Sequence, residues 1–242
     1  MCYTLTALLL TLASPALAQD REAEKLYRDM EQKIRSAKAV QFNVTIEHQG
    51  AAKDRGGMLK GSVLFTKGNQ ARLKVSGEVF GDKLNHEMVS DGKQTRLKPY
   101  VMMPQFKEEA TLPTPKHLHG ALALLVTRVG VDLSLKVMAY MLEAANEEDI
   151  EKAGDRNKLE AWDFKGGAAE KVGGREAKVV RFRVGPKGDN DSAAVTLWID
   201  GRTLAPLKLG IVPNARETYS YTETYSDFTF EPRIDARLFE LK

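Results

Sequence analysis

The sequence predicts a mainly β protein of the α+β class, in which one large curved antiparallel sheet of roughly ten strands carries an N-terminal helix and a helical insert. The clearest support lies near the C-terminus, where Val195, Leu197 and Ile199 alternate with polar residues before the turn Asp200-Gly201. Similar alternating segments recur along the chain, separated by Gly, Pro, Asn and Asp. A sheet of this kind has one apolar face and one solvated face.

An amphipathic helix is expected over 20–36, with Asp20 as its N-cap. Its apolar stripe consists of Ala23, Leu26, Tyr27, Met30 and Ile34. The apolar repeat then changes to every second residue from Val40 to Ile46, which indicates a strand buried on one side. The alternation continues to Leu97 and includes a hairpin signal, Asp91-Gly92.

The next segment, 99–150, interrupts the strands. Its prolines rule out a central strand there: Pro99, Pro104, Pro113 and Pro115. Two helical patterns follow, from Leu118 to Val129 and from Leu133 to Leu142, and both are apolar over more than half of their circumference. We therefore expect a two-helix insert over about 113–150. Strands resume at Leu159, and no low-complexity linker divides the chain, which favours a single domain over 19–242.

Residues 1–18 have the features of a secretory signal peptide that is cleaved after Ala18. Leu5 to Leu12 is a short apolar run, and Ala16-Leu17-Ala18 is a small-residue cleavage pattern, although Met1 to Thr4 lacks the usual basic residue. A buried N-terminal helix is the alternative. Export predicts a periplasmic protein, with secretion as the second choice. Cleavage also removes Cys2, the only cysteine, so we expect neither a disulfide nor a thiol site.

The charge balance argues against a nucleic-acid partner. The chain has 36 basic and 33 acidic residues, a net charge of +3. Its basic residues are spread along polar strand faces, as at Arg72, Lys74, Arg181 and Arg183, rather than pooled. The longest apolar stretch after the signal, Ala121 to Val126, is far shorter than the ~20 residues of a membrane span, so an integral membrane protein is not expected.

No set of residues predicts catalysis, a metal or a cofactor. His117-Leu118-His119 is expected at a helix start, where the two imidazoles point apart, and zinc needs further ligands. Asp189-Asn190-Asp191 lacks the spacing of a calcium loop and is expected as a hairpin turn. The sequence has no nucleophile elbow and no phosphate-binding glycine loop. We therefore predict a protein that is not an enzyme, with no catalytic residues.

Several motifs together resemble the LolA-like periplasmic lipoprotein carriers and their uncharacterised exported relatives. The helix pattern Glu-x-x-Tyr-x-x-Met-x-x-x-Ile is followed by a Val-x-Phe-x-Val-x-Ile strand. The back half contains VTLWIDGRTLAPLKLGI and then YSDFTFEPRIDARLFEL. The resemblance implies an unclosed antiparallel half-barrel, with helices covering a hydrophobic concave face that receives acyl chains. The lid-closing arginine of the true carriers has no matching motif here.

An apolar groove is the predicted site. Met88 and several methionines of the insert suit an irregular or exchanging apolar surface, although gap-filling in an ordinary core is equally plausible. The candidate lining residues are Val44, Ile46, Val75, Met88, Met102, Met103, Leu122, Leu125, Met138, Met141, Phe182 and Leu197. Tyr219, Tyr221 and Tyr225 share one strand face, where they line the groove, rim a partner surface or stabilise the sheet.

Two functions from different classes follow. The first is a soluble periplasmic protein that binds lipid or lipoprotein acyl chains in its groove. The alternative is an envelope protein–protein interaction or regulatory module of the same fold, with no lipid cargo. A hydrolase with an unrecognised site ranks last.

Overall fold

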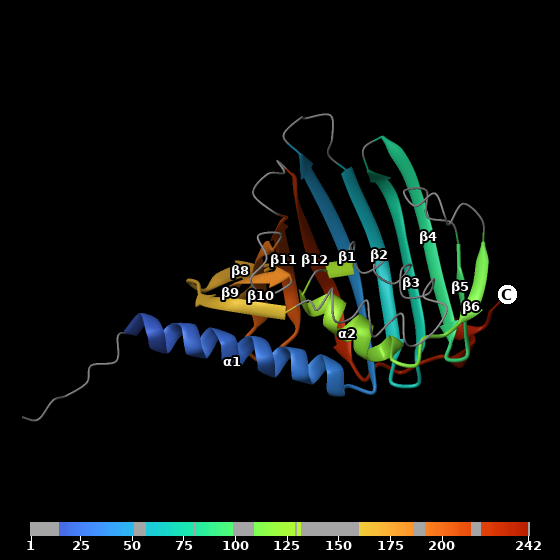
Figure 1. Ribbon diagram of the computed structural model, residues 1–242, viewed down its shortest axis with the longest axis horizontal. Helices are drawn as coiled ribbons and strands as arrows, with labels where there is room; N and C mark the ends of the chain where they lie inside the picture. The colour runs from blue at the N-terminus through green and yellow to red at the C-terminus, as the bar shows by residue number, and fades with distance from the viewer. Residues whose placement is uncertain are drawn as a thin grey trace, which may run out of the picture.

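The computed structural model describes residues 15–50, 57–79, 81–98, 109–128, 130–131, 160–185, 192–213 and 219–241. Twelve strands form one open antiparallel sheet in the order β6-β5-β4-β3-β2-β1-β12-β11-β10-β9-β7, with β8 paired to β9 (Figure 1). The strands of the first half are β1 (Ala39–Gly50), β2 (Gly57–Thr66), β3 (Gln70–Val79), β4 (Asp82–Asp91), β5 (Gln94–Leu97) and β6 (Ala110–Pro113). Those of the second half are β7 (Glu160–Gly166), β8 (Glu170–Val172), β9 (Arg175–Gly185), β10 (Ala193–Asp200), β11 (Pro206–Val212) and β12 (Tyr219–Phe230). The predicted fold class is confirmed, with two more strands than expected.

The two halves of the sheet meet at its centre, where the first strand pairs with the last. β1, the first strand, pairs with β12, the last long strand, over the length of both. The register of the two strands shifts between Gln41 and Asn43, where a β-bulge gives β12 one extra residue; Asp227 in this bulge has a φ of +54°, and its carboxylate accepts a hydrogen bond from the Asn43 amide at 2.8 Å. Bulges increase local twist and bend a strand. Figure 1 shows the sheet bending around the side that carries the helices.

Helix α1 (Pro15–Ser36) starts five residues before the predicted N-cap. Asp20 is therefore an interior residue of the helix, and its carboxylate accepts a hydrogen bond from the backbone N–H of Gly166 instead. The predicted apolar stripe is confirmed at Ala23, Tyr27, Met30 and Ile34, which are buried, and Leu26 is partly buried against them. This stripe packs α1 on β7 and β9.

The insert begins as predicted. The proline-rich segment contributes β6, an edge strand that ends at Pro113, and helix α2 (Leu118–Arg128) follows. Residues 130 and 131 are again helical, and Gly130 has a φ of +75°. The second predicted helix, Leu133 to Leu142, lies outside the described residues, as does most of the signal segment. Within the described residues, no helix combines the length and apolarity needed to span a membrane.

The C-terminal segment covers the opposite side of the sheet. After β12 the chain forms a 3-10 turn, η3 (Ala236–Phe239), capped by the carboxylate of Asp235, which accepts the Arg237 N–H. The turn contacts β3 and β4, and Phe239 is buried there. Phe239 lies outside the main apolar cluster, whereas Phe228 and Phe230 of the same terminal motif pack against that cluster, with Phe228 stacked on Phe42 at 5.0 Å between ring centroids.

Candidate functional site

The candidate site is the inner face of the sheet, which we define as the face against which α1 and α2 pack. Alternate residues of each long strand point to this face and are buried, while the residues between them are mostly exposed. In β1, for example, Val40, Phe42, Val44 and Ile46 are buried. Because strand side chains alternate between faces, the predicted period-two pattern created one continuous apolar surface.

The structure brings eight predicted groove residues into this surface. All eight belong to one buried apolar cluster: Val44, Ile46, Val75, Met88, Leu122, Leu125, Phe182 and Leu197. Six come from five different strands and two from α2, so the cluster joins the two halves of the sheet to the insert. The other four, Met102, Met103, Met138 and Met141, lie outside the described residues. That these residues line a ligand groove stays a prediction.

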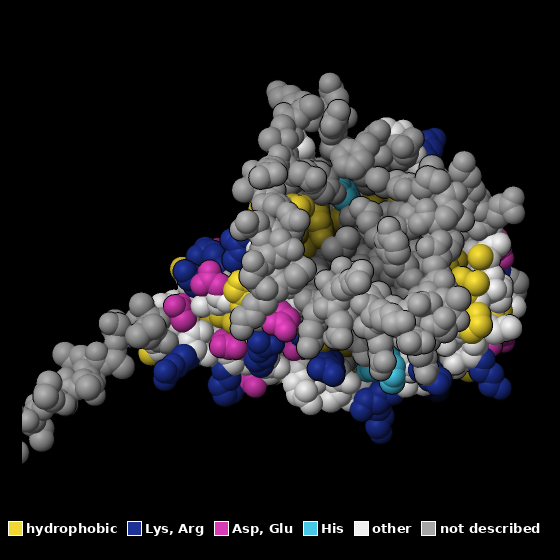
Figure 2. All heavy atoms as spheres, viewed as in Figure 1, with side chains coloured by type: hydrophobic (Ala, Val, Ile, Leu, Met, Phe, Trp, Pro, Cys, Tyr) yellow, Lys and Arg dark blue, Asp and Glu magenta, His cyan; other side chains and the backbone are white. Residues whose placement is uncertain are grey.

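Figure 2 shows hydrophobic side chains of described residues facing the viewer on this side of the molecule, with a histidine beside them. Gly61 of β2 lies between Val44 and Val75 in the strand register and adds no side chain to the inner face.

An aromatic layer supports the helix at one end of the inner face. The Tyr27 ring lies 5.0 Å from that of Phe164 and 4.8 Å from that of Phe182. The hydroxyl of Tyr27 donates a hydrogen bond to Glu31 at 3.2 Å. Burial and the neighbouring Glu31 carboxylate raise the pKa of Tyr27, so the phenol remains a donor in the physiological range.

A buried ion pair joins α1 to α2. Nε of Arg128 lies 3.0 Å from Oε1 of Glu31, and both side chains are largely removed from solvent, with 16% and 8% exposed. A buried carboxylate without a partner is costly, so the pair fixes where α2 lies relative to α1. The sequence did not predict this role of Glu31, because the apolar stripe of α1 does not show that a second helix lies beside it.

A second polar contact fixes the end of α2 to the sheet. Glu223 of β12 is fully buried, and its carboxylate accepts hydrogen bonds from the Tyr225 hydroxyl at 2.7 Å and the Val131 N–H at 2.9 Å. A Cβ on Gly130 would lie 2.6 Å from this carboxyl group, which explains the glycine. Burial and the carboxylate raise the pKa of Tyr225 well above its ordinary value. Sequence reasoning missed Glu223, although its place between two inward tyrosines was a usable signal.

The tyrosines of β12 face inward. Tyr221 and Tyr225 are 5% and 4% exposed, so of the three roles considered for this strand, the rim of an outer partner surface is excluded for these two. Tyr225 packs edge-on against Phe42 at 5.5 Å between ring centroids. The side chain of Tyr219 lies outside the described residues.

The histidine pair is divided as predicted. His119 is buried at the start of α2, where its Nε2 lies 3.2 Å from the Arg35 carbonyl oxygen, while His117 is exposed. Within the described residues, no group of three or more His, Cys, Asp or Glu side chains is placed to hold a metal ion.

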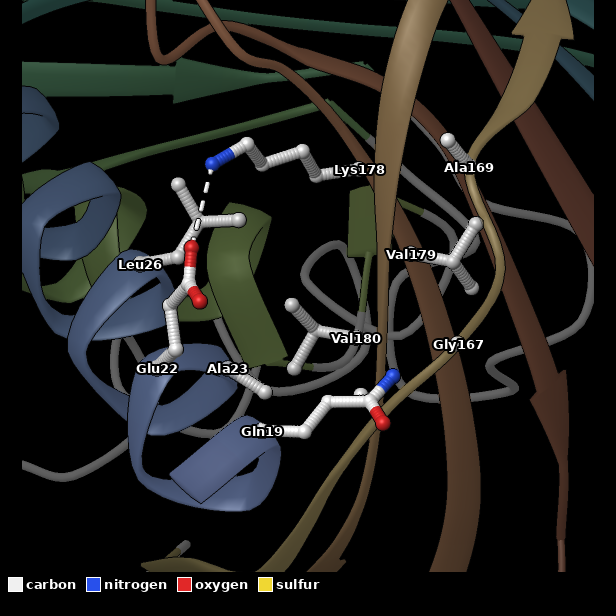
Figure 3. Close-up of a pocket in the computed structure, with 10 residues that line it drawn as sticks. Gln19, Glu22, Ala23, Leu26, Gly167, Ala169, Lys178, Val179 and Val180 are labelled. Carbon is white, nitrogen blue, oxygen red and sulfur yellow. Dashed lines mark hydrogen bonds and ion pairs between the residues drawn. The ribbon is translucent and has the colours of Figure 1, made fainter. Parts of the chain in front are cut away.

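Two small pockets flank α1. Figure 3 shows the first, between α1 and β9, where Gln19, Glu22 and Leu26 face Lys178 and Val180, and where Nζ of Lys178 lies 3.4 Å from Oε1 of Glu22. Its volume is about 140 Å³, below the ~300 Å³ of typical ligand pockets. The second, about 390 Å³, lies between α1 and the edge strand β7 and is lined largely by charged residues.

Comparisons with known proteins give structural matches alone. No family model matches the chain, and no curated protein matches its sequence. Among solved structures, the lipoprotein LppX of Mycobacterium tuberculosis is 12% identical with a TM-score of 0.47, over 89% of this chain and 98% of that one. A LolA superfamily protein of Nitrosomonas europaea is 13% identical with a TM-score of 0.33, over 90% and 97%.

A third match is the MucA/MucB complex of Pseudomonas aeruginosa, 13% identical with a TM-score of 0.44, over 91% of this chain and 61% of that one. Values at these levels assign no function to this chain.

Proposed function

We propose that this protein is a soluble periplasmic binding protein that holds an apolar ligand, a lipid or lipoprotein acyl chain, on the inner face of its sheet. The observation that carries the proposal is a continuous apolar inner face on an open sheet. A hydrocarbon chain bound there gains about 0.8 kcal/mol for each buried methylene, so a long chain binds without any polar contact. The proposal includes cleavage after Ala18 and a single domain over 19–242.

The helices give the site a way to open. α2 is fixed to its surroundings by the Glu31–Arg128 pair and by the Glu223–Val131 hydrogen bond, both of which are polar contacts. A ligand enters when these contacts break and α2 moves, and the buried apolar residues of α2, such as Leu122 and Leu125, then contact the chain. Binding is by burial of apolar surface and involves no chemistry.

Native mass spectrometry of the purified protein, before and after organic extraction, tests the proposal. We expect a lipid adduct that extraction removes, and saturable rebinding of a fluorescent lipid. The sharpest variant is Val75→Phe, which adds volume on the inner face, with Ser76→Phe as its matched control on the exposed face of the same strand.

If a hollow is present, Val75→Phe weakens lipid binding about tenfold or more and leaves thermal stability nearly unchanged. If the inner face is packed solid, the larger side chain costs about 1–3 kcal/mol of stability. Absence of any adduct and of saturable binding overturns the proposal, and a co-purifying protein in place of lipid favours an envelope interaction module.

A further inference from the structure

Several turns at one edge of the sheet lie side by side, although they are far apart in the sequence. The carbonyl of Lys38, in the connection between α1 and β1, accepts the N–H of Lys67, in the β2–β3 turn, at 2.9 Å. The β4–β5 turn approaches the same β2–β3 turn closely, since a Cβ added to Gly92 would lie 2.5 Å from the Gly68 carbonyl oxygen. The end of α1 and these turns therefore form one continuous edge.

Four exposed cations lie on this edge, which we call the basic edge: Arg35 in the last turn of α1, Lys38, Lys67 and Lys93. Lys93 belongs to the β4–β5 turn, and its carbonyl accepts the N–H of Thr114, in the segment that leads into α2, at 2.9 Å. Figure 2 shows Lys and Arg side chains along the lower margin, where α1 ends and the turns lie in Figure 1. The sequence predicted basic residues spread along strand faces, and these turns depart from that prediction.

The carboxylates at this edge do not neutralise the four cations. Within the described residues, none of the four side chains forms an ion pair with a carboxylate. Asp91 and Glu231 lie at the same edge, but their carboxylates accept backbone N–H groups, those of Lys93 and Gln94 for Asp91 and that of Lys38 for Glu231. The basic edge therefore keeps an excess of positive charge, which attracts an anionic partner.

We propose that the basic edge docks the protein on the surface of an anionic lipid bilayer. The inference rests on the proposed function, because a membrane is where a lipid ligand is collected or delivered. The cations stand on separate turns in a row, which matches the dispersed charge of many lipid headgroups. Each Lys or Arg near an anionic membrane raises the binding constant about fivefold, so a row of four gives useful affinity.

Two neighbouring features favour a membrane over an acidic protein as the partner. The C-terminal segment starts at this edge, where the Glu231 N–H donates to the Ala39 carbonyl at 2.9 Å, and Ile234 of this segment is 36% exposed. An exposed apolar side chain beside cations suits the boundary between headgroups and acyl chains. α2 also begins here, since the Asn69 side chain of the β2–β3 turn accepts the His119 N–H at 3.1 Å. Docking by this edge places the start of the covering helix at the membrane.

Vesicle flotation with the purified protein tests the inference. One set of vesicles is pure phosphatidylcholine, and the other contains about one-third phosphatidylglycerol, which makes its surface anionic. We expect the protein to bind the anionic vesicles at least about tenfold more strongly than the neutral ones at low salt. The difference should shrink as salt is added, because salt screens interactions between exposed charges.

Two triple variants with the same net charge locate the binding surface. The edge variant neutralises three lysines of the basic edge: Lys38→Gln, Lys67→Gln and Lys93→Gln. The matched control neutralises three lysines exposed on β2, β3 and β4: Lys60→Gln, Lys74→Gln and Lys83→Gln. Binding to anionic vesicles should fall at least about tenfold in the edge variant and should stay within about threefold of the wild type in the control.

Each contrary outcome has a distinct meaning. Equal losses in the two variants would assign the binding to net charge and overturn the inference. A wild-type protein that does not prefer anionic vesicles also overturns it, and an acidic protein is then the partner that the edge fits. Both results leave the proposed function standing, because lipid binding on the inner face is measured without vesicles. The wild-type comparison needs no variant, so it decides the question even if the edge variant does not fold.

Discussion

The carboxylate of Glu223 lies 2.7 Å from the hydroxyl of Tyr225, although both side chains are buried on the inner face of the sheet. The same carboxylate accepts the backbone N–H of Val131 at 2.9 Å, so one strand residue holds the end of the helical insert. This contact, together with the Arg128–Glu31 pair, places α2 over the apolar surface. The position of α2 over the inner face therefore depends on a few polar groups.

Glu223→Leu should destabilise the protein by about 2–4 kcal/mol, because it leaves a buried N–H and a buried hydroxyl without their acceptor. Urea unfolding measures the change. Glu47→Leu is the matched control, since it removes a carboxylate from the exposed face of the paired strand, and it should change stability by less than about 0.5 kcal/mol. Equal effects of the two substitutions would contradict the role given to Glu223.

Gly130→Ala should lower the melting temperature, because the new Cβ would lie 2.6 Å from the Glu223 carboxyl group and the φ of +75° disfavours alanine. Gly120→Ala, in α2, is the control: no atom lies within 4 Å of its new Cβ, and alanine in a helix should add about 0.5–1 kcal/mol. Thermal denaturation of both variants checks the opposite signs. A stabilising Gly130→Ala would show that Glu223 does not contact the chain there.

Arg128→Met should loosen α2, because it leaves the largely buried Glu31 without its closest cation, at a cost of about 2–3 kcal/mol. Hydrogen exchange of the α2 amides, measured by mass spectrometry, should become faster. Arg35→Met removes an exposed charge near the end of α1 and should leave that exchange unchanged. Unchanged exchange in Arg128→Met would mean that the ion pair does not hold α2.

Acid should weaken the fold partly through Asp200. Burial raises its pKa, but hydrogen bonds from the N–H groups of Thr203 and Arg202 and from Arg175 outweigh burial and lower the pKa to about 2 from the usual 3.8. A lowered folded-state pKa gives stability above pH 3.8 that is lost as the pH falls towards 2. The contribution is about 2 kcal/mol.

Asp200→Asn should therefore lower the unfolding free energy at neutral pH, and the difference from the wild type should disappear near pH 2. Urea unfolding of both proteins at several pH values measures this difference. Asp163→Asn is an exposed change of the same type, and its unfolding free energy should vary with pH as that of the wild type does. A constant deficit of Asp200→Asn at every pH would place the effect in packing instead of charge.

The alternation of apolar and polar residues predicted most of the sheet, because strand side chains alternate strictly between its faces. The hairpin at Asp91-Gly92 was also predictable: the Asp91 carboxylate accepts the N–H groups of Lys93 and Gln94, and Gly92 has a φ of +95°. The short strands β6 and β8 were not predictable, because the alternation of apolar and polar residues cannot be recognised in three or four residues. Their pairing with β5 and β9 decides their conformation.

For the site, the sequence predicted apolar residues that the structure gathers into one cluster. It did not predict the polar groups that hold α2 in place. Glu31 and Glu223 look like solvated charges in the sequence, because their partners Arg128 and Val131 lie about a hundred residues away. Such pairs depend on the path of the chain rather than on local periodicity. The sequence also did not predict that α1 starts at Pro15, because the segment from Pro15 to Gln19 overlaps the expected cleavage site.

The dependence of affinity on tail length tests the central claim most directly. Titration calorimetry of the delipidated protein with a series of 1-alkanols should show saturable binding whose Kd falls about fourfold with each added methylene, until the tail fills the inner face. Affinity that does not change with tail length, or heat that never saturates, would show that no hydrocarbon chain is buried there and would contradict the account.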